Sequence, residues 1–246
     1  NFTSGTSFAA PHVSGAAALL LQKNPELKNH EIKSLLVTTV QPVSDAYGQE
    51  VSLHESGSGR LDIANAYNAK LIINPINFVI NLSADQPSAE KELKIKWIEG
   101  ELEKIDVRFE GPEIIEFIHE IKKNSLQIRL SIVEEKYGDH EGKIFINHEK
   151  IQYTIPVLIH HTEGSIYVNQ ENEKLFFEIE HPDKWSFAKI IITNSKNGNT
   201  DTVTTTPNKE TSLKIYENGE YWIDAKIKVN GNTSDAFNTI KINSLS

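Results

Sequence analysis

The stretch from Gly5 to Gly15 constrains the fold of this chain more than any other, because a tight polar turn runs directly into an apolar helix. Gly5 suits a sharp turn because it has no Cβ, and Thr6 and Ser7 are residue types favoured at a helix N-terminus. The residues that follow are nearly all apolar, and a helix that is apolar all round is typical of a buried helix. The pattern therefore predicts Ser7 at the start of a buried helix, beside free backbone N–H groups and the positive end of the helix dipole.

Such a position can hold a nucleophile and stabilise the oxyanion that its attack creates. The run resembles the catalytic-serine motif of the subtilisin-like serine proteases, and the residues that support the match are Gly5, Thr6, Ser7, Ala10, Pro11, His12 and Gly15. The resemblance implies that Ser7 is the nucleophile and that its backbone N–H is one oxyanion donor. Phe8, where methionine is frequent, and Ser14, where alanine is frequent, are mild departures from the family pattern. The alternative interpretation is a serine that caps a core helix.

A serine hydroxyl needs an adjacent base, which must itself be oriented by a third group. The chain order in the family is Asp, His, Ser, whereas only six residues precede Ser7. The resemblance therefore places the Asp, the His and a side-chain oxyanion donor upstream, so the chain by itself is expected to be inactive. His12 is structural in the family, and no sequence signal places His30 or His54 against Ser7.

Two later segments complete the part that resembles the protease. A second helix is predicted from about residue 29 to 39, before Gln41-Pro42. The run Gly57-Ser58-Gly59-Arg60-Leu61-Asp62 resembles the segment that closes the catalytic domain, with Asp62 suited to cap a short helix. Residues 1–70 are thus expected to form the C-terminal helical piece of an α/β subtilisin-like catalytic domain. Because the sheet that covers such a helix in the family is missing, this piece is expected to expose apolar surface.

From Leu71 onward the pattern changes to the alternation of β-strands. Residues 71–162 are predicted to form an antiparallel sandwich. This region resembles the fibronectin-III-like domain that follows the catalytic domain in minor extracellular and cell-envelope subtilases. The fold class expected for the chain is therefore mixed, with a helical piece followed by all-β domains.

A second all-β sandwich of immunoglobulin or fibronectin type is predicted over residues 163–246. Asn197-Gly198 and Asn230-Gly231 are expected to form hairpin turns. Tyr221 is interpreted as an anchor for a corner of this sandwich rather than as a ligand contact. The alternative to a protease fragment is that the β domains are a non-catalytic module that binds substrate, cell wall or another domain.

The composition of the chain disfavours some classes of binding partner. The net charge is −9 with no basic cluster, which disfavours nucleic acid and anionic membranes, and no apolar run is long enough to span a bilayer. There is no cysteine, so disulfides are excluded. The resemblance implies a polypeptide substrate, the upstream part of the same protease as a partner, and an extracellular or cell-surface, cell-wall-associated location in a bacterium. No cofactor is expected for the chemistry; calcium is common in the family, but nothing in the sequence localises a site.

Other chemically suggestive residues have simpler interpretations. His160-His161 with Glu163 suggests a metal site, but adjacent residues of a strand point to opposite faces, which favours a linker. An acidic loop lacks the spacing of a calcium loop; it comprises Glu134, Glu135, Asp139 and Glu141. No metal-binding residues are therefore predicted. The tryptophans are interpreted as core or edge residues rather than a sugar-binding platform; they are Trp97, Trp185 and Trp222.

Overall fold

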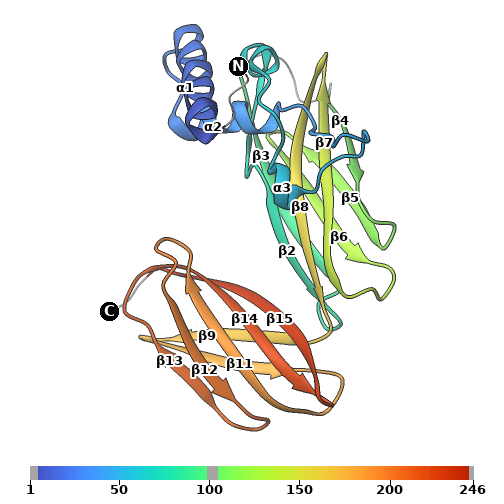
Figure 1. The fold of residues 1–246 in the computed structure, drawn as a ribbon, viewed down its shortest axis with the longest axis vertical. Coiled ribbons are helices and arrows are strands. Elements are labelled where there is room, and N and C mark those ends of the chain that lie inside the picture. The colour runs from blue at the N-terminus through green and yellow to red at the C-terminus, as the bar shows by residue number, and fades with distance from the viewer. Residues whose placement is uncertain (1–4, 99–104, 244–246) are drawn as a thin grey trace. The chain divides into compact units, whose positions relative to one another are not determined.

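The computed structural model describes residues 5–98 and 105–243. The chain divides into two compact units, unit 1 with residues 1–80, 90–133 and 140–159, and unit 2 with residues 81–89, 134–139 and 160–246. The described helices all lie in unit 1: α1 (Thr6–Lys23), α2 (Asn29–Thr38), α3 (Leu53–Ser56) and α4 (Ile63–Asn68) (Figure 1). None of these described helices combines the length and the apolar character that a bilayer span requires.

The predicted helices are observed where expected. The second helix runs over Asn29–Thr38, with Lys28 as its N-cap residue. Asp62 caps α4 as predicted, because its carboxylate accepts the Asn65 N–H at 2.8 Å.

The strands that follow α4 form two four-stranded sheets, ordered β1-β3-β6-β5 and β2-β8-β7-β4. Their bounds are β1 (Leu71–Asn74), β2 (Phe78–Ser83), β3 (Ser88–Trp97), β4 (Ile105–Glu110), β5 (Ile115–Lys122), β6 (Ser125–Ile132), β7 (Gly138–His148) and β8 (Ile151–Thr162). The two sheets are in contact at their edge strands, where the rings of Phe109 on β4 and Phe117 on β5 stack with centroids 5.2 Å apart. The first three residues of strand β1 are buried, and the strand pairs with β3.

Unit 2 contains a three-stranded sheet, ordered β13-β10-β9, and a four-stranded sheet, ordered β12-β11-β14-β15. The bounds are β9 (Ser165–Glu171), β10 (Lys174–Glu180), β11 (Trp185–Asn194), β12 (Thr200–Thr205), β13 (Thr211–Lys214), β14 (Gly219–Val229) and β15 (Asn232–Ile242). One apolar core lies between these sheets and draws on both, for example through Leu175, Ile190 and Ile223. This arrangement defines a β-sandwich.

Two local predictions for unit 2 are confirmed. Asn230 and Gly231 join β14 to β15 with φ angles of 49° and 87°, as a two-residue hairpin of type I′ requires. Tyr221 is buried, and its hydroxyl donates to the Glu217 carbonyl at 2.8 Å and accepts from the Asn194 amide at 3.3 Å. Tyr221 therefore anchors a corner of the sandwich.

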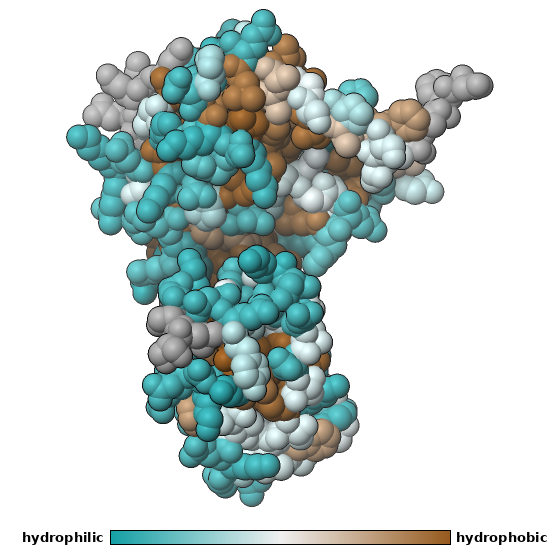
Figure 2. All heavy atoms as spheres, turned by 90° about the vertical axis from the view of Figure 1, so that its left-hand side faces the viewer, coloured by the Kyte–Doolittle hydropathy of each residue, from teal (hydrophilic) through white to brown (hydrophobic). Residues whose placement is uncertain are grey.

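Helix α1 exposes most of its apolar side chains. Only Ala16 and Leu20 are buried, whereas the exposed apolar residues include Phe8, Val13, Leu19 and Leu21. Figure 2 faces the α1 side of unit 1 and shows hydrophobic side chains gathered at its surface. A helix of this composition is not buried within the chain, which agrees with the expectation that residues 1–70 expose apolar surface.

Candidate functional site

Ser7 is the second residue of α1 and is exposed to solvent. The N-cap residue is Gly5, with φ 157° and ψ 154°, and its carbonyl accepts the N–H groups of Phe8 and Ala9 at 3.0 and 3.2 Å. No side chain caps the helix, so neither Thr6 nor Ser7 acts as the cap that their residue types suggest. The N–H of Ser7 belongs to the first turn, so it has no partner within the helix. Its hydroxyl and its N–H therefore lie together at the positive end of the helix dipole.

Pro11 and His12 shape the turn that follows. Pro11 lies inside α1 and has no N–H to donate to the carbonyl of Ser7 four residues earlier. His12 is exposed, and its Nδ1 hydrogen-bonds the Phe8 carbonyl at 2.6 Å. Its ring is thus held against its own helix, a structural role like the one that the family resemblance implies.

The two other histidines considered as bases belong to other segments. His30 lies on α2, and His54 lies on α3, where its Nε2 is 3.8 Å from the Glu141 carboxylate. Glu141 also accepts the Leu53 N–H at 2.7 Å, so this carboxylate holds the start of α3. Among the described contacts, none joins either histidine to Ser7.

Polar contacts fasten the helices of unit 1 to its first sheet. Ser34 on α2 is buried, and its Oγ donates to the Ile73 carbonyl at 2.8 Å and accepts the Ile73 N–H at 2.9 Å. It thereby satisfies both backbone groups of Ile73 on β1 in the way a neighbouring strand would. Lys23, at the end of α1, donates to the Tyr67 carbonyl of α4 at 2.5 Å. The helix that carries Ser7 is thus linked through α4 and α2 to the β-sheet.

Tyr153 closes the junction between the helical piece and the sheet. Its side chain is fully buried, and its hydroxyl accepts the backbone N–H groups of Lys70 and Leu71 at 2.8 and 3.0 Å. Burial raises the pKa of Tyr153 despite these hydrogen bonds, so the phenol is neutral at ordinary pH. Neither Ser34 nor Tyr153 was singled out from the sequence, because a serine in a helix and a tyrosine in a strand carry no signal for their distant partners.

Glu31 is a nearly buried carboxylate that joins α2 to β3. It accepts the Lys28 N–H at 2.9 Å and pairs with Lys96 at 2.6 Å. The Lys28 backbone hydrogen bond, followed by the contact with Lys96, lowers the pKa of Glu31 below its ordinary value of 4.5.

We expect Glu31 to make unit 1 sensitive to acid. A carboxylate with a lowered folded-state pKa stabilises the fold above its unfolded pKa, and this stabilisation is lost as the pH falls through the folded value. Urea denaturation of the wild type and of Glu31→Gln should show that stability falls more steeply below pH 4.5 in the wild type. Equal pH profiles for the two proteins would contradict the assignment.

The remaining sequence candidates do not converge on one site. His160 pairs with Asp139 at 2.5 Å, while the Nδ1 of His161 hydrogen-bonds the Lys136 carbonyl at 2.9 Å. In the described residues no group of three or more potential ligand side chains is arranged to hold a metal ion. Trp97 and Trp185 are half-buried, but Trp222 is 49% exposed on β14, which lies between β11 and β15. The interpretation as a core or edge residue is therefore wrong for Trp222.

The family model described as "Subtilase family" matches residues 1–59. The resemblance to the subtilisin-like serine proteases is thereby confirmed for this N-terminal segment.

Three curated relatives are similar to parts of this chain. The chain is similar to the minor extracellular protease Vpr of Bacillus subtilis, with 22% identity over 58% of this chain and 19% of that protein. It is similar to the subtilisin-like protease SBT1.6 of Arabidopsis thaliana, with 36% identity over 31% of this chain and 11% of that protein. It also matches the autotransporter lipoprotein NalP of Neisseria meningitidis, with 45% identity over 26% of this chain and 6% of that protein. The chain thus spans less than a fifth of the length of these relatives.

The solved structures that resemble the chain are multidomain β proteins. Titin domains A168–A170 align with a TM-score of 0.29 and 6% identity over 71% of this chain and 66% of that chain. A two-domain fibronectin type-III segment of chicken tenascin aligns with a TM-score of 0.29 and 12% identity over 62% of this chain and 91% of that chain. TM-scores this low do not define a fold, so the β architecture is described from its own strand order and core.

Proposed function

We propose that this chain supplies the nucleophile segment of a subtilisin-like serine endopeptidase. Ser7 attacks the scissile carbonyl of a polypeptide after a histidine outside this chain takes the proton of its hydroxyl. The Ser7 N–H, together with a side-chain amide outside this chain, stabilises the oxyanion of the tetrahedral intermediate. The released proton passes from the histidine to the leaving amine, and water then hydrolyses the acyl-enzyme.

The observation that carries this proposal is the geometry of the first turn of α1. An exposed serine lies at the N-terminus of a helix of 18 residues, its N–H has no intrahelical partner, and among the described residues no side chain hydrogen-bonds the helix end as a cap. The match of residues 1–59 to the subtilase family supports the assignment of this serine as the nucleophile. The alternative role of Ser7, a helix cap, is unsupported because the structure gives α1 no side-chain cap.

We assign three parts to the chain: the end of a catalytic domain over residues 1–70, a fibronectin-III-like sandwich over 71–162 and a second sandwich over 163–246. The first sandwich supports the nucleophile segment, because Ser34 and Tyr153 tie the helices to its strands. The exposed apolar side chains of α1 are the surface that the rest of the catalytic domain covers. We place the parent enzyme outside the cell or on the cell surface of a bacterium.

The proposal is tested by comparing hydrolysis of an unfolded polypeptide by the chain and by the natural polypeptide that includes the catalytic Asp and His. The chain by itself should show no turnover above background, because loss of the base removes most of the catalytic power of a serine. The natural polypeptide should cleave the substrate. Turnover by the isolated chain would contradict the proposed division of the catalytic residues.

A further inference from the structure

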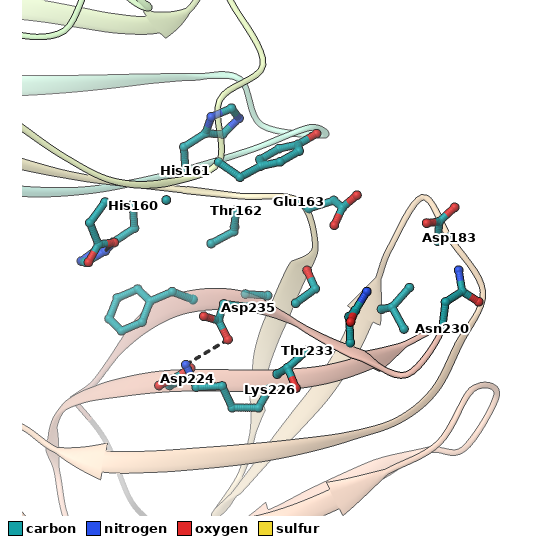
Figure 3. A pocket seen from close by; sticks show the side chains of 18 residues that line it. His160, His161, Thr162, Glu163, Asp183, Asp224, Lys226, Asn230, Thr233 and Asp235 are labelled. Atoms are coloured by element: carbon teal, nitrogen blue, oxygen red, sulfur yellow. Dashed lines mark hydrogen bonds and ion pairs between the residues drawn. The ribbon is translucent and has the colours of Figure 1, made fainter.

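Unit 2 contains a hollow of about 700 Å³ to which the proposed serine chemistry assigns no role. We call it the β14–β15 groove. The outer face of β14 and β15 contributes Asp224, Lys226 and Asp235, and residues 137–139 and 160–163 form the opposite wall (Figure 3). Its volume lies within the range of about 300–1,000 Å³ that is typical of ligand pockets.

The charges of the groove favour a cation. Its walls carry one ammonium group, on Lys226, against five carboxylates, on Asp139, Glu163, Asp183, Asp224 and Asp235. The Nζ atom of Lys226 is 2.9 Å from Asp235 and 3.5 Å from Asp224, so it compensates only part of this charge. His160 pairs with Asp139 at 2.5 Å. Among the described residues, Asp183 forms no salt bridge, and the Glu163 carboxylate approaches only the Nε2 of His181, at 3.4 Å.

The buried imidazole of His181 next to Glu163 distinguishes the β14–β15 groove from an ordinary acidic surface. The side chain of His181 has no exposed surface, and among the described residues its Nε2 has no hydrogen-bond partner. This nitrogen faces the Glu163 carboxylate on the wall of the groove at 3.4 Å, which is longer than a good hydrogen bond. A buried polar atom without a hydrogen bond is unfavourable. A ligand that orders the Glu163 carboxylate would therefore also improve the surroundings of His181.

Aromatic rings line the same hollow. The ring of Phe237 lies 5.3 Å from that of His160, and the ring of Tyr137 lies 4.7 Å from that of His161. All four residues line the groove. An ammonium or guanidinium group is attracted both by carboxylates and by the faces of aromatic rings.

We propose that the β14–β15 groove binds a lysine or arginine side chain of an extended polypeptide segment. Glu163 and Asp183 pair with the cation. The planar guanidinium of arginine can pair with a carboxylate through two hydrogen bonds, so arginine is the preferred residue. This binding site is separate from Ser7, and its existence does not depend on the proposed protease activity.

The test uses the full chain and a short acetylated, amidated peptide that contains arginine flanked by glycine. The comparison peptide has glutamine in place of arginine, and binding is followed by isothermal titration and by NMR shifts of the β14 and β15 amides. We expect saturable binding of the arginine peptide that weakens as salt is added, and no saturable binding of the glutamine peptide. Glu163→Gln and Asp183→Asn should each weaken binding by about two- to fivefold, the range measured for exposed ion pairs.

Two further variants make the result decisive. Glu171→Gln removes a carboxylate from the exposed end of β9, outside the groove, and should leave the dissociation constant unchanged. Asp183→Lys reverses a charge on the wall of the groove but keeps the backbone N–H that donates to the Nδ1 of His181 at 3.0 Å, and it should abolish saturable binding. Equal affinity for the two peptides, or unchanged affinity in Asp183→Lys, would overturn the proposal.

Discussion

Ser7→Ala should lower the kcat of the natural polypeptide by on the order of 10⁶-fold while leaving its fold intact. The nucleophile and its base act as one unit, so the loss of the nucleophile removes the catalysis that the two residues provide together. Ser7 is exposed at the start of α1 and provides no cap to the helix, so removing its hydroxyl carries little cost in stability. The measurement is the rate of peptide hydrolysis at saturating substrate, with circular dichroism as the check on folding.

Ser14→Ala is the matched control for this experiment. Ser14 lies on the same helix and is also exposed, but its hydroxyl donates to the Ala10 carbonyl at 3.1 Å. Its loss should change kcat by less than about tenfold, because the hydroxyl takes no part in the chemistry. A similar loss of activity in both variants would indicate damage to α1 and would contradict the assignment of Ser7 as the nucleophile.

Tyr153→Phe should destabilise unit 1 by about 2–4 kcal/mol, the largest effect on stability that we expect from the loss of a single oxygen atom. The hydroxyl of Tyr153 accepts two backbone N–H groups at the point where the helical piece joins β1. Phenylalanine leaves both donors without this acceptor, and the Leu71 N–H is buried. Native-state hydrogen exchange is the suitable measurement, because it reports on β1 and β8 separately from unit 2.

Tyr216→Phe is the control for Tyr153→Phe. Tyr216 is 79% exposed, so the loss of its hydroxyl should change stability by less than about 0.5 kcal/mol. If Tyr153→Phe left the exchange of the Leu71 amide unchanged, the hydroxyl of Tyr153 would not hold the junction together.

The sequence predicts best those features that depend on neighbouring residues. The Asp62 cap and the Asn230-Gly231 hairpin each depend on a few adjacent residues, and the structure places both as expected. Strand β14 likewise alternates along its length between buried residues, such as Tyr221 and Ile223, and more exposed ones.

The missed features depend on partners far along the chain. Strand β1 has only four residues and lacks alternation, and its pairing with β3 could not be inferred from its own pattern. Ser34 is separated by 39 residues from Ile73, the residue whose backbone it satisfies. The same holds for the β14–β15 groove, because the local sequence around His160 and Glu163 favours a linker and does not indicate that the outer face of β14 and β15 lies opposite.

The apolar pattern of α1 predicts the helix but not the exposure of its side chains in this chain. Its composition indicates a buried helix, yet in this chain Phe8 and Val13 are 55% and 47% exposed. Local sequence specifies that a helix forms and which faces are apolar, but the layer that buries those faces lies elsewhere in the fold. The proposed upstream part of the catalytic domain supplies that layer.

The central claim is that Ser7 is a nucleophile activated by residues outside this chain, and covalent labelling tests it most directly. The natural polypeptide and the isolated chain would each be treated with a fluorophosphonate, digested and mapped by mass spectrometry. We predict an adduct on the peptide that contains Ser7 in the natural polypeptide, and no adduct on the isolated chain. Labelling of Ser7 in the isolated chain, or labelling of the natural polypeptide only at another residue, would contradict the claim.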